Sequence, residues 1–130
     1  MPMGMSRRLS LQFVLFLVLA GLQGCNRDAK PLVSPRDIGN AQHGASLVRS
    51  YGCGSCHTIK GIPEANGVVG PPLSNVGNRI YIAGMLRNTP DNMERWIENP
   101  QAVVPGNVMP KLGITRDESR DITAYLYTLR

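Results

Sequence analysis

The stretch GCGSCHTIKG, residues 52–61, places two cysteines three positions apart and a histidine directly after the second. Four kinds of site compete for Cys53, Cys56 and His57. A redox dithiol usually starts a helix between two strands, and the surrounding sequence predicts no strands. A zinc site needs about four ligands, whereas the whole chain holds two histidines and three cysteines. A disulfide would satisfy the two thiols but give the histidine no role.

Attachment of a c-type haem, the fourth kind of site, uses all three side chains of this motif. The two thiols bond to the vinyl groups of the porphyrin, and the histidine that follows them becomes an iron ligand. The sequence therefore predicts one covalent haem c, held by Cys53 and Cys56, with His57 on one face of the iron. A second axial ligand has to come from elsewhere in the chain.

Met109 is the expected second ligand. It lies in VPGNVMP, residues 104–110, between two predicted helices. Pro110 favours an extended backbone at Met109, and Pro105-Gly106 predict a turn before it. A stiff, non-helical segment of this kind can hold a thioether sulfur toward a metal, and such a ligand favours reduced iron. Weaker candidates are Met85 in a loop, Met93 on the apolar face of a helix, and His43 on an expected solvent-exposed face.

An apolar segment, LSLQFVLFLVLAGL at residues 9–22, follows Arg7 and Arg8. It is shorter than the roughly 20 residues that span a membrane, and its position is typical of a secretory signal peptide. The residues LQGC that end at Cys25 resemble the lipobox of bacterial lipoproteins, whose cysteine is lipidated and becomes the new N-terminus. We therefore predict a signal peptide over residues 1–24 and lipidation of Cys25. An uncleaved anchor helix is the alternative, and both tether the protein outside the cytoplasm.

The charge of the chain points to no nucleic-acid partner. The formal net charge is +5, and removal of the two signal arginines would lower it to +3. There is no run of lysines and arginines and no interleaved aromatic stripe. Residues 25–40 contain two prolines and several charges without apolar periodicity, so they are expected to be a lipid-anchored linker. The folded domain is expected over residues 41–130.

Two helices are predicted before the methionine segment. The first covers residues 41–51 and stops at Gly52, a residue type that often ends helices. The second begins at Thr89-Pro90, a hydroxyl cap followed by proline at the first helical position. It ends before Pro100, because the residue before a proline avoids the helical conformation.

A third helix is predicted to begin at Thr115, with Glu118 completing a capping box. Its apolar stripe consists of Ile122, Tyr125, Leu126 and Leu129. Between the first two helices, residues 61–88 are rich in glycine and proline and show no strand alternation. A loop of this length in a small domain is expected to wrap a ligand.

Taken together, residues from about 44 to 129 resemble a class I cytochrome c. Beyond the cysteine–histidine motif, GPPL at residues 70–73 resembles the family's GPxL segment. WIENP at residues 96–100, followed by PGNVMP, is similar to its helix and methionine loop. The resemblance implies an all-α fold with three main helices wrapped around one haem, in which the first and last helices cross at Gly44 and at Tyr125-Leu126.

The same resemblance implies individual roles around the haem. The carbonyl of Pro71 would accept a hydrogen bond from His57 and so orient it, and Leu73 would pack on the haem face. The implied cofactor-binding residues are Cys53, Cys56, His57, Pro71, Leu73, Arg79, Trp96 and Met109.

A narrower resemblance covers IAGMLRNTPDNMERWIENPQAVVPGNVMP, residues 82–110. This segment is similar to the cytochrome domain fused to subunit II of some bacterial haem-copper oxidases. By that resemblance Arg79 meets a haem propionate. The oxidase subunit also has two membrane helices and a copper domain, for which this chain offers no counterpart. Only the single-haem electron-transfer role is therefore expected to carry over.

These observations predict an electron carrier and not an enzyme. With His57 and Met109 both on the iron, no position is left for oxygen or peroxide. We expect a membrane-tethered, extracytoplasmic cytochrome of a bacterial respiratory chain, with redox proteins such as a terminal oxidase as partners. The alternatives are the haem subunit of a larger dehydrogenase or reductase, and a peroxidase-like or gas-sensing haem protein. Solvated charges near the haem edge are expected from Arg49, Lys60 and Lys111.

Overall fold

The computed structural model describes residues 33–130. The predicted signal peptide, Cys25 and the linker up to residue 32 lie outside the described residues. The described part is mostly helical, as the predicted all-α fold requires. Its helices are α2 (Pro35–Ile38), α3 (Ala41–Ser50), α4 (Pro90–Glu98), α5 (Pro100–Val103) and α6 (Arg116–Leu126), and its strands are β1 (Tyr81–Ile82) and β2 (Leu86–Arg87). None of the helices in residues 33–130 is long and apolar enough to cross a membrane.

Helix α3 begins and ends where the sequence predicts, to within one residue. The side chain of Asn40 caps it by accepting hydrogen bonds from the backbone N–H groups of Gln42 and His43, both at 3.1 Å. After Ser50 the chain turns at Gly52, whose φ of 67° lies in the left-handed region that favours glycine. This turn carries the chain directly into the cysteine motif.

Helix α6 has the predicted capping box. The backbone N–H of Glu118 donates to the hydroxyl of Thr115, and the Glu118 carboxylate accepts from the Thr115 backbone N–H at 2.9 Å. These bonds satisfy donors that the first turn of a helix leaves unpaired. The helix ends at Leu126, so Leu129 of the predicted stripe lies beyond it.

Helix α4 starts with Thr89 as its cap, as predicted, and ends at Glu98. The prediction for the residues after it was incomplete. Pro100 ends α4 but also opens the one-turn helix α5, because proline suits the first position of a helix and the Asn99 side chain caps the new turn. The methionine segment therefore leaves from α5.

The long loop between α3 and α4 contains a small hairpin that the sequence analysis did not predict. Strands β1 and β2 pair antiparallel, with Tyr81 opposite Arg87 and Ile82 opposite Leu86. Each strand has only two residues, too few to show an alternating pattern. The guanidinium of Arg87 lies 5.9 Å from the centre of the Tyr81 ring, within reach of a cation–π interaction.

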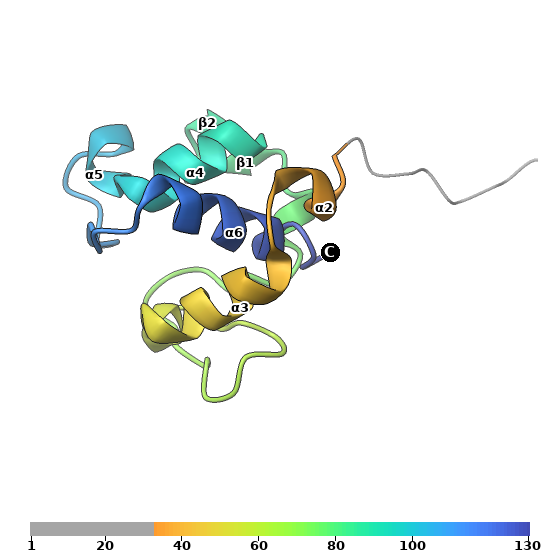
Figure 1. Cartoon of the computed structure of the whole chain (residues 1–130). Coiled ribbons are helices and arrows are strands. Elements are labelled where there is room, and N and C mark those ends of the chain that lie inside the picture. Colours follow the sequence, from red (N-terminus) through yellow and green to blue (C-terminus); the bar gives the residue numbers. More distant parts are fainter. Residues whose placement is uncertain (1–32) are drawn as a thin grey trace, which may run out of the picture. The chain divides into compact units, whose positions relative to one another are not determined.

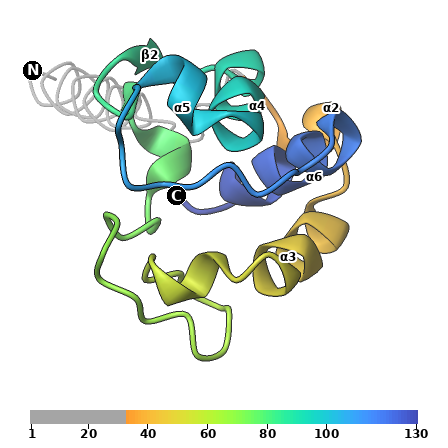
Figure 2. The ribbon, with the colours of Figure 1, turned by 90° about the vertical axis from the view of Figure 1, so that its left-hand side faces the viewer.

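Helix α6 lies between α3 on one side and α4 on the other, and two views agree on this arrangement (Figures 1 and 2). The crossing of α3 and α6 takes place at Gly44, but the contact differs from the expected one. A Cβ atom at Gly44 would collide with the backbone of Asp121 and Ile122, one turn before the predicted Tyr125-Leu126. The glycine is needed because backbone meets backbone there.

The described end of the predicted linker packs on the domain. Ile38 of α2 contacts the hydrophobic core, and the backbone N–H of Asn40 donates to the Asp121 carboxylate at 2.7 Å. At the other terminus the Arg130 side chain donates to the carbonyl of Val33 at 3.1 Å. Residues 33–40 are thus in contact with α6 and the segment that follows it, and α2 is helical where no helix was predicted.

Candidate functional site

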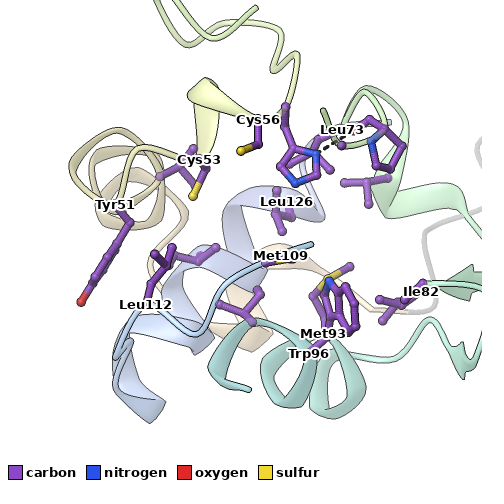
Figure 3. A pocket seen from close by; sticks show the side chains of 18 of the residues that line it. Tyr51, Cys53, Cys56, Leu73, Ile82, Met93, Trp96, Met109, Leu112 and Leu126 are labelled. Atoms are coloured by element: carbon purple, nitrogen blue, oxygen red, sulfur yellow. Dashed lines mark hydrogen bonds between the residues drawn. The ribbon is translucent and has the colours of Figure 1, made fainter. Parts of the chain in front are cut away.

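One apolar cavity of about 350 Å³ lies among α3, α4, α6 and the loops between them. A volume of this order is within the usual range for ligand pockets. Figure 3 shows Cys53 and Cys56 on one side of it, with Trp96 and Met109 across from them. All the residues predicted for the site line this cavity: Cys53, Cys56, His57, Pro71, Leu73, Arg79, Trp96 and Met109.

The cysteine motif forms a tight turn. Residues Cys53–Ser55 are a 3₁₀ helix, and the carbonyl of Cys53 accepts hydrogen bonds from the backbone of Cys56 at 3.3 Å and of His57 at 3.0 Å. This turn brings two thiols and an imidazole to one wall. Both cysteines are free, so the disulfide alternative does not describe them. Burial raises the pKa of the Cys53 thiol.

The orientation of His57 follows from one hydrogen bond. Its Nδ1 lies 2.8 Å from the carbonyl oxygen of Pro71, and a carbonyl can only accept, so Nδ1 carries the proton. The other ring nitrogen, Nε2, is then left with its lone pair available to a metal. The bond that the family resemblance implied is therefore present.

Gly70 is a site residue to which the sequence analysis gave no role of its own. A Cβ atom there would collide with the imidazole ring of His57. The backbone N–H of Gly70 also donates to the carbonyl of Cys56 at 2.8 Å. The loop thus packs directly on the ring it orients, and only the absence of a side chain permits that approach. The glycine before two prolines was the available signal.

The structure distinguishes the candidates for the second iron ligand by whether they line the cavity. Met109 lines the cavity, whereas Met85 is 67% exposed and is absent from the cavity wall. Met93 is 2% exposed and lies on the α4 face toward the cavity, so it is both core and lining. His43 is outside the cavity lining and donates a hydrogen bond through Nδ1 to the Asp121 carboxylate at 2.7 Å. Of the candidates for a second ligand, Met109 and Met93 remain.

Arg79 is held on the cavity wall by its own loop. Its guanidinium donates to the carbonyl of Pro72, and its backbone carbonyl accepts from the Asn88 side chain at 2.8 Å. The hydroxyl of Tyr127 in turn donates to Asn88 at 3.0 Å. A cation held at an apolar cavity suits an anionic group of a ligand, and the propionate contact of Arg79 stays a prediction.

Most of the apolar wall was not assigned to the site from the sequence, although Ile122 and Leu126 were predicted as part of the apolar stripe of α6. It comes from side chains that belong to separate elements and meet only in the folded protein. Among them are Val48 of α3, Ile82 of β1, Ile97 of α4, and Ile122 and Leu126 of α6. The exposed cations Arg49, Lys60 and Lys111 are not part of the lining.

The residues present fit a haem c. Paired thiols adjoin a histidine whose Nε2 has its lone pair available, the side chains of Met93 and Met109 line the same cavity, and most of the other lining residues are apolar. Within residues 33–130 no group of three or more His, Cys, Asp or Glu side chains could hold a metal ion, so this part of the chain gives the zinc alternative no support. The donor set suits an iron porphyrin bonded through two cysteines.

The His43–Asp121 pair makes stability depend on pH. Burial alone would raise the pKa of Asp121, but hydrogen bonds from His43 and the Asn40 backbone outweigh it, and the pKa lies below its ordinary value. The ionised carboxylate therefore stabilises the fold above about pH 4, and this contribution is lost as pH falls through the folded-state pKa. Asp121→Asn is expected to destabilise the protein by about 1 kcal/mol at pH 7. Urea unfolding at pH 7 and at pH 3 measures the difference, which should shrink at the lower pH.

The control for this prediction is Asp117→Asn, on the same helix. The Asp117 side chain is 92% exposed, so its replacement should change the free energy of unfolding little at either pH. An Asp121→Asn variant as stable as wild type at pH 7 would contradict the assigned role of the carboxylate.

Comparison with known proteins agrees with this geometry. The cytochrome c family model matches residues 41–130. Cytochrome c oxidase subunit 2 of Alkalihalophilus pseudofirmus is 35% identical over 69% of this chain and 26% of the relative. The cytochrome c homolog of Bradyrhizobium diazoefficiens is 29% identical over 78% and 60%, and cytochrome c2 of Rhodopila globiformis is 39% identical over 60% and 83%.

The chain spans about a quarter of the length of the first of these relatives. The match to the family model nonetheless covers the three main helices, the cysteine motif and the methionine loop. A thiol pair, an oriented histidine and a methionine around one apolar cavity are what such a match predicts. The chain therefore belongs to the cytochrome c family, and its cofactor is a single, covalently attached haem c.

Proposed function

We propose that this chain is a single-haem electron carrier of a bacterial respiratory chain, tethered to the membrane outside the cytoplasm. One observation carries the proposal. His57, with Nε2 free, and Met109 line the same apolar cavity as the thiols of Cys53 and Cys56. His57 and Met109 would therefore both be available as iron ligands, which favours electron transfer over the binding of a substrate.

Each of these residues has a distinct task in the proposed site. Cys53 and Cys56 would hold the cofactor by thioether bonds, and His57 and Met109 would be its iron ligands. Haem c supplies the one-electron redox chemistry, and a methionine ligand favours the reduced form. The Pro71 carbonyl keeps the proton of His57 on Nδ1. The apolar walls would keep water away from the iron. The charged side chains at the surface are hydrated and keep the folded domain soluble in water.

The proposed membrane tether is supported by the sequence, and the proposed redox partner by the matched relatives. The lipobox-like LQGC at residues 22–25 supports lipidation of Cys25, which lies outside the residues that the structure describes. A terminal oxidase is the proposed acceptor, because the matched relatives include subunits of cytochrome c oxidase. In those relatives the matching segment is part of a longer subunit, whereas here we propose a separate carrier.

The test is to express the full chain in a bacterium with c-type haem maturation and to fractionate the cells. The pyridine haemochrome assay should find one covalent haem per chain, in the membrane fraction. A Cys25→Ser variant should move the haem-bearing chain out of that fraction. The reduced wild-type protein should not bind carbon monoxide stoichiometrically.

Three different outcomes would contradict separate parts of the proposal. Absence of covalent haem would reject the electron-carrier role altogether. Fast, stoichiometric binding of carbon monoxide would favour the peroxidase-like or gas-sensing alternative. Constant copurification with a dehydrogenase or reductase would favour the haem-subunit alternative over a separate carrier.

A further inference from the structure

The loop that presents Met109 is bound by one side chain from outside it. Gln101 is the second residue of α5, and its amide contacts the backbone of the loop at three points. The amide oxygen accepts from the N–H of Gly106 at 3.0 Å. The amide nitrogen donates to the carbonyl of Asn107 at 2.9 Å and to the carbonyl of Met109 itself at 3.0 Å.

The chemistry of the partners determines which way this amide faces. Carbonyl oxygens only accept and a backbone N–H only donates, so the amide nitrogen must face the two carbonyls. In this orientation three of the four hydrogen-bonding positions of the Gln101 amide are used, all of them on the loop. A glutamate of the same size would lose both donors.

The rest of the loop offers few other constraints. Pro105 and Pro110 have no N–H to donate. The Asn107 side chain adds two bonds, accepting from the Met109 N–H at 2.8 Å and donating to the carbonyl of Val104, and the Asn107 backbone N–H donates to the same carbonyl at 3.2 Å. In the described part of the chain, every hydrogen bond made by residues 105–110 has its partner within residues 101–109. Among the described helices, only α5 holds this loop by side-chain hydrogen bonds.

We propose that Gln101 is the positioning residue that keeps Met109 at the haem iron and so closes the sixth coordination position. This inference rests on the proposed role of Met109 as a ligand. Gln101 itself is not part of the cavity lining, whereas Asn107 is. A change at Gln101 therefore acts on the site only through the loop.

The experiment measures how fast cyanide binds to the ferric, haem-loaded protein. Cyanide needs the sixth position, so its rate reports how often Met109 is away from the iron. Gln101→Ala removes all three hydrogen bonds, and Gln101→Glu places a carboxylate oxygen against two carbonyls. Both variants are expected to bind cyanide about tenfold faster than wild type, or more. The methionine–iron charge-transfer band of the ferric protein should weaken in parallel.

The matched control is Gln42→Ala, which removes the same side chain from an exposed position on α3. Its cyanide rate should equal that of wild type. The inference is overturned if both Gln101 variants bind cyanide within twofold of wild type and keep the band. It is also overturned if neither variant folds, because Gln101 would then support the whole domain. A wild-type protein without the band would instead reject Met109 as a ligand and with it the proposed site.

Discussion

Met109→Ala is expected to convert a closed haem site into one that binds carbon monoxide stoichiometrically when reduced. The reason is that Met109 lies in the cavity wall across from the cysteine motif, and alanine has no atom that can reach a metal. Loss of a thioether ligand also removes its preference for reduced iron, so the midpoint potential should fall by on the order of 100 mV. Carbon monoxide difference spectra and a redox titration measure the two effects.

Two other methionines serve as controls for this result. Met85→Ala changes an exposed side chain outside the cavity lining and should leave both measurements unchanged. Met93→Ala removes a buried side chain of α4 and should cost about 2–5 kcal/mol of stability without opening the iron. If the Met93 variant binds carbon monoxide and the Met109 variant does not, the two assignments have to be exchanged.

The second large effect is expected from Gly44→Ala. Helix propensity alone would stabilise α3 by about 1 kcal/mol, because alanine is the better helix former. The new Cβ atom, however, would collide with the Asp121 carbonyl in α6, and a helix backbone cannot move aside as a flexible side chain can. We expect net destabilisation of about 2–3 kcal/mol or more, seen as a lower urea midpoint of the haem-loaded protein.

Gln42→Ala again provides the control, since it lies two residues earlier on the same helix and is exposed. Its free energy of unfolding should change by no more than about 0.5 kcal/mol. A Gly44→Ala variant that is more stable than wild type would show that propensity outweighs the contact. The two helices would then have to move apart at their crossing without loss of stability.

Features that depend on neighbouring residues were predicted well. The cap of α6 needs only Thr115 and Glu118, three positions apart, and the stop of α3 needs only Gly52. The hairpin of β1 and β2 and the one-turn helices α2 and α5 were missed. Helices of four residues and strands of two are shorter than the stretches over which helical periodicity or strand alternation can be recognised, so packing decides them.

In the candidate site, too, the features set by short motifs were predicted and those set by packing were not. The residues that carry chemistry belong to short motifs, and the cysteine motif, the GPPL segment and the methionine loop all contribute to one cavity. The crossing partner of Gly44 was expected at Tyr125-Leu126 and is at Asp121-Ile122. A one-turn difference along a helix leaves the periodicity unchanged, so no pattern in the sequence can distinguish the two.

By itself the sequence determined the cofactor class of this protein and the three main helices around it. Those properties depend on residue types at short, fixed spacings, which chemistry and local hydrogen bonding make recognisable. Only the tertiary structure decided that Gly70 packs on the His57 ring, that Gln101 binds the Met109 loop, and that α3, β1, α4 and α6 share one apolar wall. Such contacts depend on how separate segments meet in space, and a hydrogen bond or a close approach requires its partner within a few ångströms.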